Sequence, residues 1–178
     1  MINKTGFMCA VAMVRPDSRG MIYLRSKDPE QKPAIDPKLL SAETKDLFRI
    51  VNGTMRVKEL FNTEAMKKVG AKLWDLKYPR CKKFELWSED YVTCFIQHTA
   101  FPGQHLCCTC GMGNHEYAVV DENLRVKGGV KNVRVADSSA MPAIIAGNTN
   151  AAVMMIAAKG ADLILKDAAA YDAPRVRR

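Results

Sequence analysis

The sequence has no apolar run long enough to cross a membrane. A membrane-spanning helix needs roughly 18 to 20 consecutive apolar residues, and the longest candidate, AAVMMIAAKGADLIL, is interrupted by Lys159 and Asp162. The apolar share is 48% and the charged share 26%, which is typical of a globular protein rather than a disordered one. We therefore expect this run to form a buried helix and expect no membrane span.

A cleavable secretory leader is not recognisable at the N-terminus. Lys4 precedes an apolar run from Phe7 to Val14, but Arg15 and Pro16 follow this run in place of a small-residue cleavage site. The six cysteines also lack the regular spacing that would define a disulfide framework. The sequence leaves the compartment open.

The positive charge is not concentrated on one segment. Lys and Arg number 27 against 19 Asp and Glu, which gives a net charge of +8, and both signs are interleaved between Arg25 and Lys83. A nucleic-acid-binding protein gathers Lys and Arg, together with aromatic residues, on one face. We therefore expect no nucleic-acid binding, and the surplus charge mainly affects solubility.

The hydrophobic pattern predicts a mixed α and β protein without internal repeats, and 178 residues suffice for one domain with a core. β-rich runs at 9–15 and 21–25 flank the turn PDSRG and predict a hairpin, and a second hairpin is predicted around the KGG of residues 127–129. Apolar residues at helical spacing and capping residues predict four helices, over 42–61, 63–68, 89–98 after a Ser88 cap, and 149–166.

One short stretch concentrates chemically reactive side chains. HLCCTCGMG, residues 105–113, contains one histidine and three cysteines, and His115 follows it. These atoms suit a zinc site, although structural zinc sites usually have a second, distant pair of ligands, which is missing here. Adjacent Cys107 and Cys108 also suit a buried or redox-sensitive thiol pair. Taken alone, the residues leave a metal site, a thiol pair and an active-site loop open.

A second stretch, VRVADSSAMPAIIAGNTNAAVMMIAAKGADLI at 133–164, resembles the C-terminal signature of the glucose–methanol–choline (GMC) family of FAD-dependent alcohol oxidoreductases. It contains a V-x-D-x-S-x-M-P loop, then G-N-T-N-A, then an Ala/Met/Ile-rich helix. Residues 105–113 are similar to the family's H-P-x-G-T-C-x-M-G motif, and 119–137 resemble the run between the two motifs. The stretch RPDSRGMIYLRSKDPEQKP, 15–33, is similar to the insect glucose-dehydrogenase-like branch.

The resemblance implies an α+β fold, namely the end of the sheet-plus-helices substrate domain with the segment that returns to the FAD domain. We expect one GMC C-terminal domain over 1–178, matched over about 8–166, with 167–178 as a tail. No G-x-G-x-x-G occurs in the sequence, so the βαβ unit that binds the ADP half of FAD is not expected in this chain. A separate FAD-binding domain would then be its partner. Without that domain, apolar surface such as the Met154–Ile156 face is expected to stay exposed.

The resemblance also implies catalytic residues. Removing hydride from an alcohol carbon requires the hydroxyl proton to leave as well, and imidazole, with an ordinary pKa of about 6.5, suits the acceptor role. The family's motif histidine corresponds to His105, and the family's second catalytic position, His or Asn, corresponds to Asn148. The carboxamide of Asn148 is expected to position the substrate oxygen, although an Asn before a helix is by default a capping residue.

The cofactor implied is FAD. Thr149 and Asn150 begin the long helix, and its positive end is expected beside the flavin N1 and C2 carbonyl, where it would stabilise the reduced flavin. Asp137 and Ser138 match the family loop beside the ribityl and phosphate region. The substrate is expected to be a small alcohol, and a sugar, a sterol and a simple alcohol all remain open.

The histidine loop departs from the family motif at three positions. Leu106 replaces a proline, Cys108 replaces a glycine, and Gly111 replaces a Lys or Arg. Proline and glycine control the backbone conformation, and a misplacement of about 1 Å can reduce a rate roughly a hundredfold. Two alternative functions therefore stay open: an inactive descendant that only binds a partner, and a Cys/His metal or redox protein.

Overall fold

The computed structural model describes residues 6–172, which pack as two compact units that divide between Phe101 and Pro102. Each unit has a hydrophobic core of its own. The buried core residues of the N-terminal unit are Val51, Cys81, Tyr91, Val92 and Ile96. Those of the C-terminal unit are Val120, Leu124, Ala140, Met141 and Ile156. The expectation that residues 1–178 form one GMC C-terminal domain concerns how the family divides into domains, and it stays a prediction.

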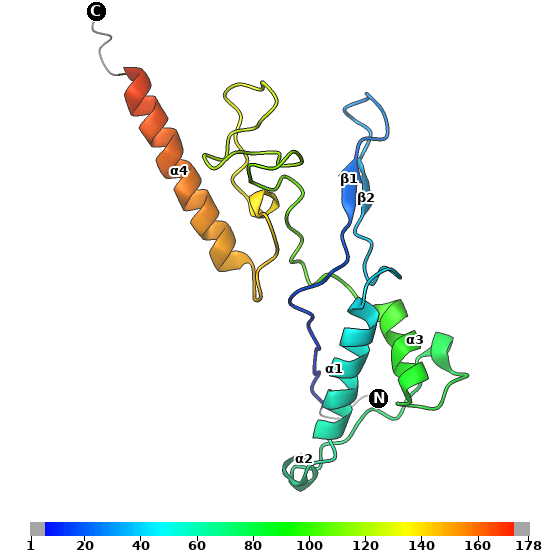
Figure 1. The fold of residues 1–178 in the computed structure, drawn as a ribbon. Coiled ribbons are helices and arrows are strands. Elements are labelled where there is room, and N and C mark those ends of the chain that lie inside the picture. Colours follow the sequence, from blue (N-terminus) through cyan, green and yellow to red (C-terminus); the bar gives the residue numbers. More distant parts are fainter. Residues whose placement is uncertain (1–5, 173–178) are drawn as a thin grey trace, which may run out of the picture. The chain divides into compact units, whose positions relative to one another are not determined.

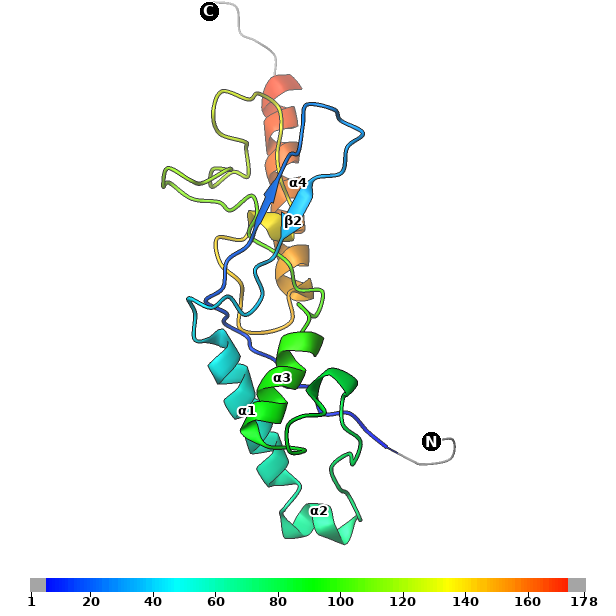
Figure 2. The same cartoon turned by 90° about the vertical axis from the view of Figure 1, so that its right-hand side faces the viewer.

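Two helices lie side by side and supply most of the buried core of the N-terminal unit (Figures 1 and 2). They are α1, Asp46–Leu60, and α3, Glu89–Thr99, and both confirm predicted helices. The predicted Ser88 cap is also confirmed, because the Ser88 side chain accepts a hydrogen bond from the Tyr91 backbone N–H at 3.1 Å. The short helix α2, Glu64–Lys68, follows α1, and the 3-10 helix η1, Pro79–Cys81, precedes α3.

The predicted hairpin of 9–15 with 21–25 is wrong. Strand β1, Met21–Tyr23, pairs antiparallel with β2, Ala34–Asp36, and residues 9–15 form no strand. The turn PDSRG is instead attached to α1, because the carboxylate of Asp46 accepts hydrogen bonds from the backbone N–H groups of Asp17, at 2.9 Å, and Ser18, at 2.7 Å. A contact across 28 residues therefore replaces the local strand pairing.

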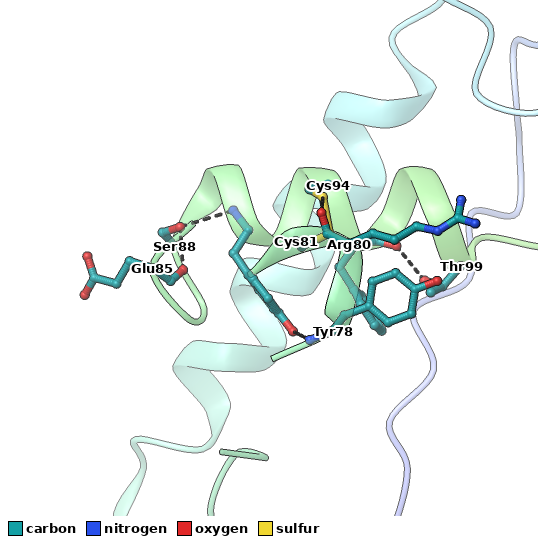
Figure 3. Close-up of a disulfide and its surroundings, with 9 residues drawn as sticks. Tyr78, Arg80, Cys81, Glu85, Ser88, Cys94 and Thr99 are labelled. Carbon is teal, nitrogen blue, oxygen red and sulfur yellow. Dashed lines mark hydrogen bonds between the residues drawn. A yellow bond between two sulfur atoms is a disulfide. The ribbon is translucent and has the colours of Figure 1, made fainter. Parts of the chain in front are cut away.

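A disulfide joins Cys81 of η1 to Cys94 of α3 (Figure 3). Its two cysteines lie 13 positions apart, and the sequence spacing did not identify them as a pair. Cys81 is completely buried in the N-terminal core. Closing a loop of this length stabilises a folded protein by about 3 kcal/mol in the chain-entropy account, so the bond fixes η1 against α3.

The C-terminal unit combines one long helix with irregular loops. Helix α4, Asn150–Asp172, confirms the predicted helix but continues beyond Lys166, so the first half of the expected tail is helical and 173–178 lie outside the described residues. The predicted hairpin around KGG is confirmed in part. No extended strand forms there, but Arg125 and Arg134 make an antiparallel bridge across the turn. The N–H groups of Val126 and Val135 also donate to the carbonyls of Val133 and Leu124. Gly128 and Gly129 adopt the positive φ of a turn, as the glycine pair suggests.

One side of α4 packs on the core of its own unit and another side is exposed. Met154 and Met155 are 59% and 66% exposed, which agrees with the predicted apolar face, whereas Ile156 is buried with Val120 and Leu124. Successive residues of an α-helix are turned by about 100°, so Ile156 lies on the side away from Met154. The prediction that Ile156 is exposed was therefore wrong. No helix within 6–172 is both long and apolar enough to span a membrane. Helices with one small sheet confirm the α+β class.

Candidate active site

A recess of about 530 Å³ in the C-terminal unit collects most of the predicted site residues. Its wall is built from three segments: the histidine loop, the start of η2 (Ser138–Ala140), and the start of α4. The lining residues are Gly103, Gln104, His105, Leu106, Ser138, Asn148, Thr149, Asn150 and Val153. Segments that lie more than 40 residues apart in sequence thus contribute to one concave surface.

His105 and Asn148 are in direct contact within this recess. The Nε2 atom of the imidazole lies 3.0 Å from the Oδ1 atom of the carboxamide, across 43 residues of sequence. The second ring nitrogen, Nδ1, hydrogen-bonds the backbone carbonyl of Gly103. The structure therefore brings together the two residues that the sequence assigned to catalysis, while their catalytic roles stay predictions.

The start of α4 supplies the polar part of the recess. Thr149 and Asn150 lie on the wall beside Ser138, and Thr149 is 9% exposed. The first turn of α4 contains no acidic residue that would neutralise the positive end of the helix dipole. Hydroxyl, amide and helix-end N–H groups form a donor set that suits a group carrying negative charge. These residues therefore fit the electron-rich edge of a reduced flavin.

Asp137 lies at the edge of this arrangement and does not line the recess. Its carboxylate accepts a hydrogen bond from the Ser139 backbone N–H at 2.7 Å and so caps η2. Hydrogen bonding from Ser139 holds the pKa of Asp137 below its usual value, although partial burial acts in the opposite direction. The contact of Asp137 with FAD that the resemblance implies stays a prediction.

A backbone ladder fixes the cysteine loop to η2, and no residue pattern in the sequence indicates it. Three N–H groups between 108 and 112 donate to the three carbonyl groups of η2 over 2.9–3.1 Å. Because η2 begins with Ser138, which also lines the recess, this ladder holds the histidine loop in register with the rest of the wall. Gln104, Leu106 and Val153 also line the recess and were not identified from the sequence.

The departures from the family motif are visible in this loop. Cys108 has φ +74°, a left-handed conformation that the glycine of the motif adopts without strain. The sulfur atoms of Cys107 and Cys108 lie 2.8 Å apart, and both side chains are half-buried. Among the residues of the described range, no group of three or more His, Cys, Asp or Glu side chains is arranged to bind a metal. Cys108 therefore occupies a backbone conformation that favours glycine.

Known proteins resemble this chain in sequence. The family model of the GMC oxidoreductases matches residues 16–157. Glucose dehydrogenase (FAD, quinone) of Drosophila pseudoobscura pseudoobscura is 38% identical over 164 residues, which cover 91% of this chain and 26% of that protein. Oxygen-dependent choline dehydrogenase of Citrobacter koseri is 35% identical over 168 residues, which cover 92% of this chain and 28% of that protein.

Solved structures are similar as well. Pyridoxine 4-oxidase from Mesorbium loti matches with a TM-score of 0.68 and 29% identity over 84% of this chain and 28% of its own. A formate oxidase matches with a TM-score of 0.72 and 28% identity over 87% of this chain and 26% of its own. The chain thus spans about a quarter of the length of the relatives it matches. Because the family model covers well over half of its residues, the chain belongs to the GMC oxidoreductase family.

Proposed function

We propose that this chain is the C-terminal part of an FAD-dependent oxidoreductase that oxidises the CH–OH group of an alcohol. The observation that carries the proposal is the contact between His105 and Asn148, at 3.0 Å, in a recess that also contains the start of α4. The glucose and choline dehydrogenases among the relatives support an alcohol-type donor.

His105 is proposed to accept the hydroxyl proton. When bound, FAD supplies the acceptor for the hydride of the alcohol carbon. Transfer of that hydride leaves a carbonyl only if the hydroxyl proton departs too, and the imidazole faces the recess where that hydroxyl would lie. A positioned general base of this kind contributes roughly a hundredfold to ten-thousandfold to a rate.

Asn148 is proposed to position the substrate oxygen. Its carboxamide lies within hydrogen-bond distance of the His105 ring, so one oxygen atom of a substrate could contact both side chains. Holding the alcohol in one orientation lowers the entropy cost of reaching the transition state and so raises the rate.

Ser138, Thr149 and Asn150 are proposed to contact the flavin, with Asp137 shaping the loop beside them. The wall also contains apolar surface from Leu106 and Val153, so the recess suits an alcohol with both hydroxyl and hydrocarbon parts. Sugars, sterols and simple alcohols all meet this description. An FAD-binding domain, supplied outside these residues, is proposed as the partner that completes the site. We expect the isolated chain to bind FAD weakly and to turn over little substrate.

The test is His105→Ala in an enzyme completed with a GMC flavin domain. We expect turnover of an alcohol substrate to fall by at least roughly a hundredfold, with the flavin absorbance of the purified protein unchanged. His115→Ala is the matched control, because His115 is exposed and does not line the recess. Unchanged turnover in His105→Ala would reject this histidine as the base. Absence of bound flavin in the unsubstituted enzyme, with the fold intact, would favour a protein that only binds a partner.

A further inference from the structure

We propose that Gly103 is a positioning residue that determines which nitrogen of His105 accepts the proton. It acts through its backbone carbonyl, which faces the imidazole Nδ1 atom. The claim that this nitrogen acts as the base rests on the function proposed above. The claim about which nitrogen carries the hydrogen concerns the ring of His105 alone.

The hydrogen-bonding chemistry of the two partners fixes the proton. A backbone carbonyl can only accept hydrogen bonds, so the Nδ1 atom facing Gly103 must carry a hydrogen. In a neutral imidazole only one nitrogen carries a hydrogen, which leaves the lone pair on Nε2. Nε2 is the nitrogen beside Asn148. The Gly103 carbonyl therefore directs the basic atom toward the recess.

The Asn148 carboxamide suits both protonation states of this arrangement. The Oδ1 atom lies 3.0 Å from Nε2, and an amide oxygen can only accept a hydrogen bond. This contact therefore requires a hydrogen on Nε2, as in the ring that has accepted a proton. Turning the amide so that its NH₂ group faces Nε2 would satisfy the neutral ring, which has a lone pair there. The carbonyl of Gly103 stays an acceptor for Nδ1–H in both states.

A tight turn aims the Gly103 carbonyl at the ring. Gly103 has φ +62° and Gln104 has φ +61°, and the backbone N–H of His105 donates to the carbonyl of Pro102 at 3.3 Å. Two central residues with positive φ inside such a hydrogen bond are the pattern of a type I′ turn. The turn therefore returns the chain on itself directly before His105.

The requirement for glycine at 103 is conformational rather than steric. A Cβ atom built at this position would lie 3.6 Å from Nδ1 of His105, which is an ordinary contact distance. A left-handed backbone, however, costs an L-residue roughly 1–2 kcal/mol, and Gln104 already adopts one. A β-branched residue at 103 would therefore drive the turn into another conformation and move its carbonyl away from the ring.

The experiment measures the tautomer of His105 by NMR in this chain, with no flavin and no substrate. Histidine is labelled with ¹⁵N, and His98→Gln and His115→Gln remove the other two rings. At about pH 8.5, where an ordinary imidazole is neutral, the couplings between ring protons and ring nitrogens show which nitrogen carries hydrogen. We expect the Nδ1–H form to predominate. A ring that carries its hydrogen on Nε2 would overturn the proposal without any variant.

Three variants then isolate the turn. Gly103→Val should lower the ratio of the Nδ1–H to the Nε2–H form by roughly threefold to tenfold, the equivalent of one net hydrogen bond. Gly128→Val is the matched control, because Gly128 also has a positive φ, of +77°, with open space around it and no place in the recess. Gly103→Asn should keep the ratio of the unsubstituted chain, since Asn tolerates the left-handed conformation.

The outcomes separate this inference from the proposed function. An equal loss of the ratio in Gly103→Val and Gly128→Val, or no loss in Gly103→Val, would overturn the role of Gly103. Either result leaves the oxidoreductase proposal intact, because that proposal is tested by turnover and flavin binding in the completed enzyme. Conversely, an enzyme that lacks turnover could still show the expected tautomer.

Discussion

Asn148 combines two possible roles at the scale of a single residue. It contacts His105 and lies two residues before the first residue of α4. The N-cap position itself is held by Thr149, whose carbonyl accepts the first helical hydrogen bond from the Val153 N–H. Support of the helix start and contact with His105 are separable, because serine suits a helix start about as well as asparagine but has no carboxamide.

We therefore predict different results for two substitutions at this position in the completed enzyme. Asn148→Ala should slow hydride transfer by roughly tenfold or more, as expected for a lost positioning contact. Asn148→Ser should slow it similarly while keeping the unfolding temperature of the unsubstituted enzyme. Stopped-flow reduction of the flavin and thermal unfolding measure the two effects. Full recovery of the rate in the serine variant would mean that the carboxamide of Asn148 is not needed for hydride transfer.

Asp46 shows how one buried carboxylate makes stability depend on pH. Burial raises its pKa, but hydrogen bonds from the backbone of Asp17 and from Ser18, with the nearby charge of Arg49, outweigh this effect and lower it overall. A lowered folded-state pKa means that the stabilisation is present above the unfolded-state value of about 4 and is lost as the pH falls through the folded-state value.

Asp46→Asn should accordingly reduce the free energy of unfolding by about 2 kcal/mol at pH 7, since hydrogen bonds to a charged group are worth about 1.5–3 kcal/mol. The loss should shrink below pH 4. Urea denaturation followed by circular dichroism at several pH values measures it. Asp17→Asn is the control, because the Asp17 side chain is exposed and its ion pair with Arg49 is worth at most about 1 kcal/mol. A pH-independent loss in Asp46→Asn would contradict the assignment.

At the scale of elements, α4 depends on close approach to its own core at one position. A Cβ atom built on Gly160 would lie 3.0 Å from the Ala136 Cβ atom and 3.4 Å from the Leu124 Cδ1 atom. Gly160 therefore lets the helix backbone approach the preceding loop, and a larger residue requires the neighbouring side chains to yield by a few tenths of an ångström.

We predict that Gly160→Val lowers the free energy of unfolding of the C-terminal unit by about 1–3 kcal/mol, which is typical of an overpacked core. Ala161→Val, on the exposed side of the same helix, should change it by no more than about 0.5 kcal/mol. Amide hydrogen exchange along α4 would resolve the effect. Equal protection in both variants would show that the contact with Ala136 is unimportant.

The elements also show which parts of the fold a sequence can predict. The helix after Ser88 could be predicted because its cap and its apolar spacing are local. The partner of β1 could not, because the competing contact of Asp46 with Asp17 and Ser18 bridges about 28 residues and has no local signature. The approach of His105 to Asn148 across 43 residues followed only from the family resemblance, and spacing alone contained no information on it.

At the scale of the whole molecule, the exposed side of α4 indicates where further protein would bind. Met154, Met155, Ile164 and Leu165 are 49–67% exposed. Large apolar side chains gathered on one exposed surface are typical of an interaction site, and the chain spans about a quarter of the relatives' length. We propose on these grounds that the FAD-binding domain covers this side of α4.

We predict that Met155→Lys with Leu165→Lys reduces self-association of the isolated chain, measured by sedimentation velocity, without unfolding it. The same pair should lower the thermal stability of the completed enzyme, because it would bury two charges. Ile156→Lys is the contrasting control, since Ile156 belongs to the core of the C-terminal unit and its substitution should unfold that unit. Unchanged stability of the completed enzyme would place the FAD-binding domain elsewhere.

The bond between Cys81 and Cys94 has a consequence for where this chain can mature. Such a link forms and persists in oxidising surroundings such as the endoplasmic reticulum, the periplasm or the cell exterior, whereas glutathione keeps cytosolic thiols reduced. In a reducing host the Cys81 thiol would remain buried in the core, and no covalent bond would join η1 to α3. Recombinant material made in the cytosol is therefore expected to need oxidative refolding before its N-terminal half gains full resistance to heat.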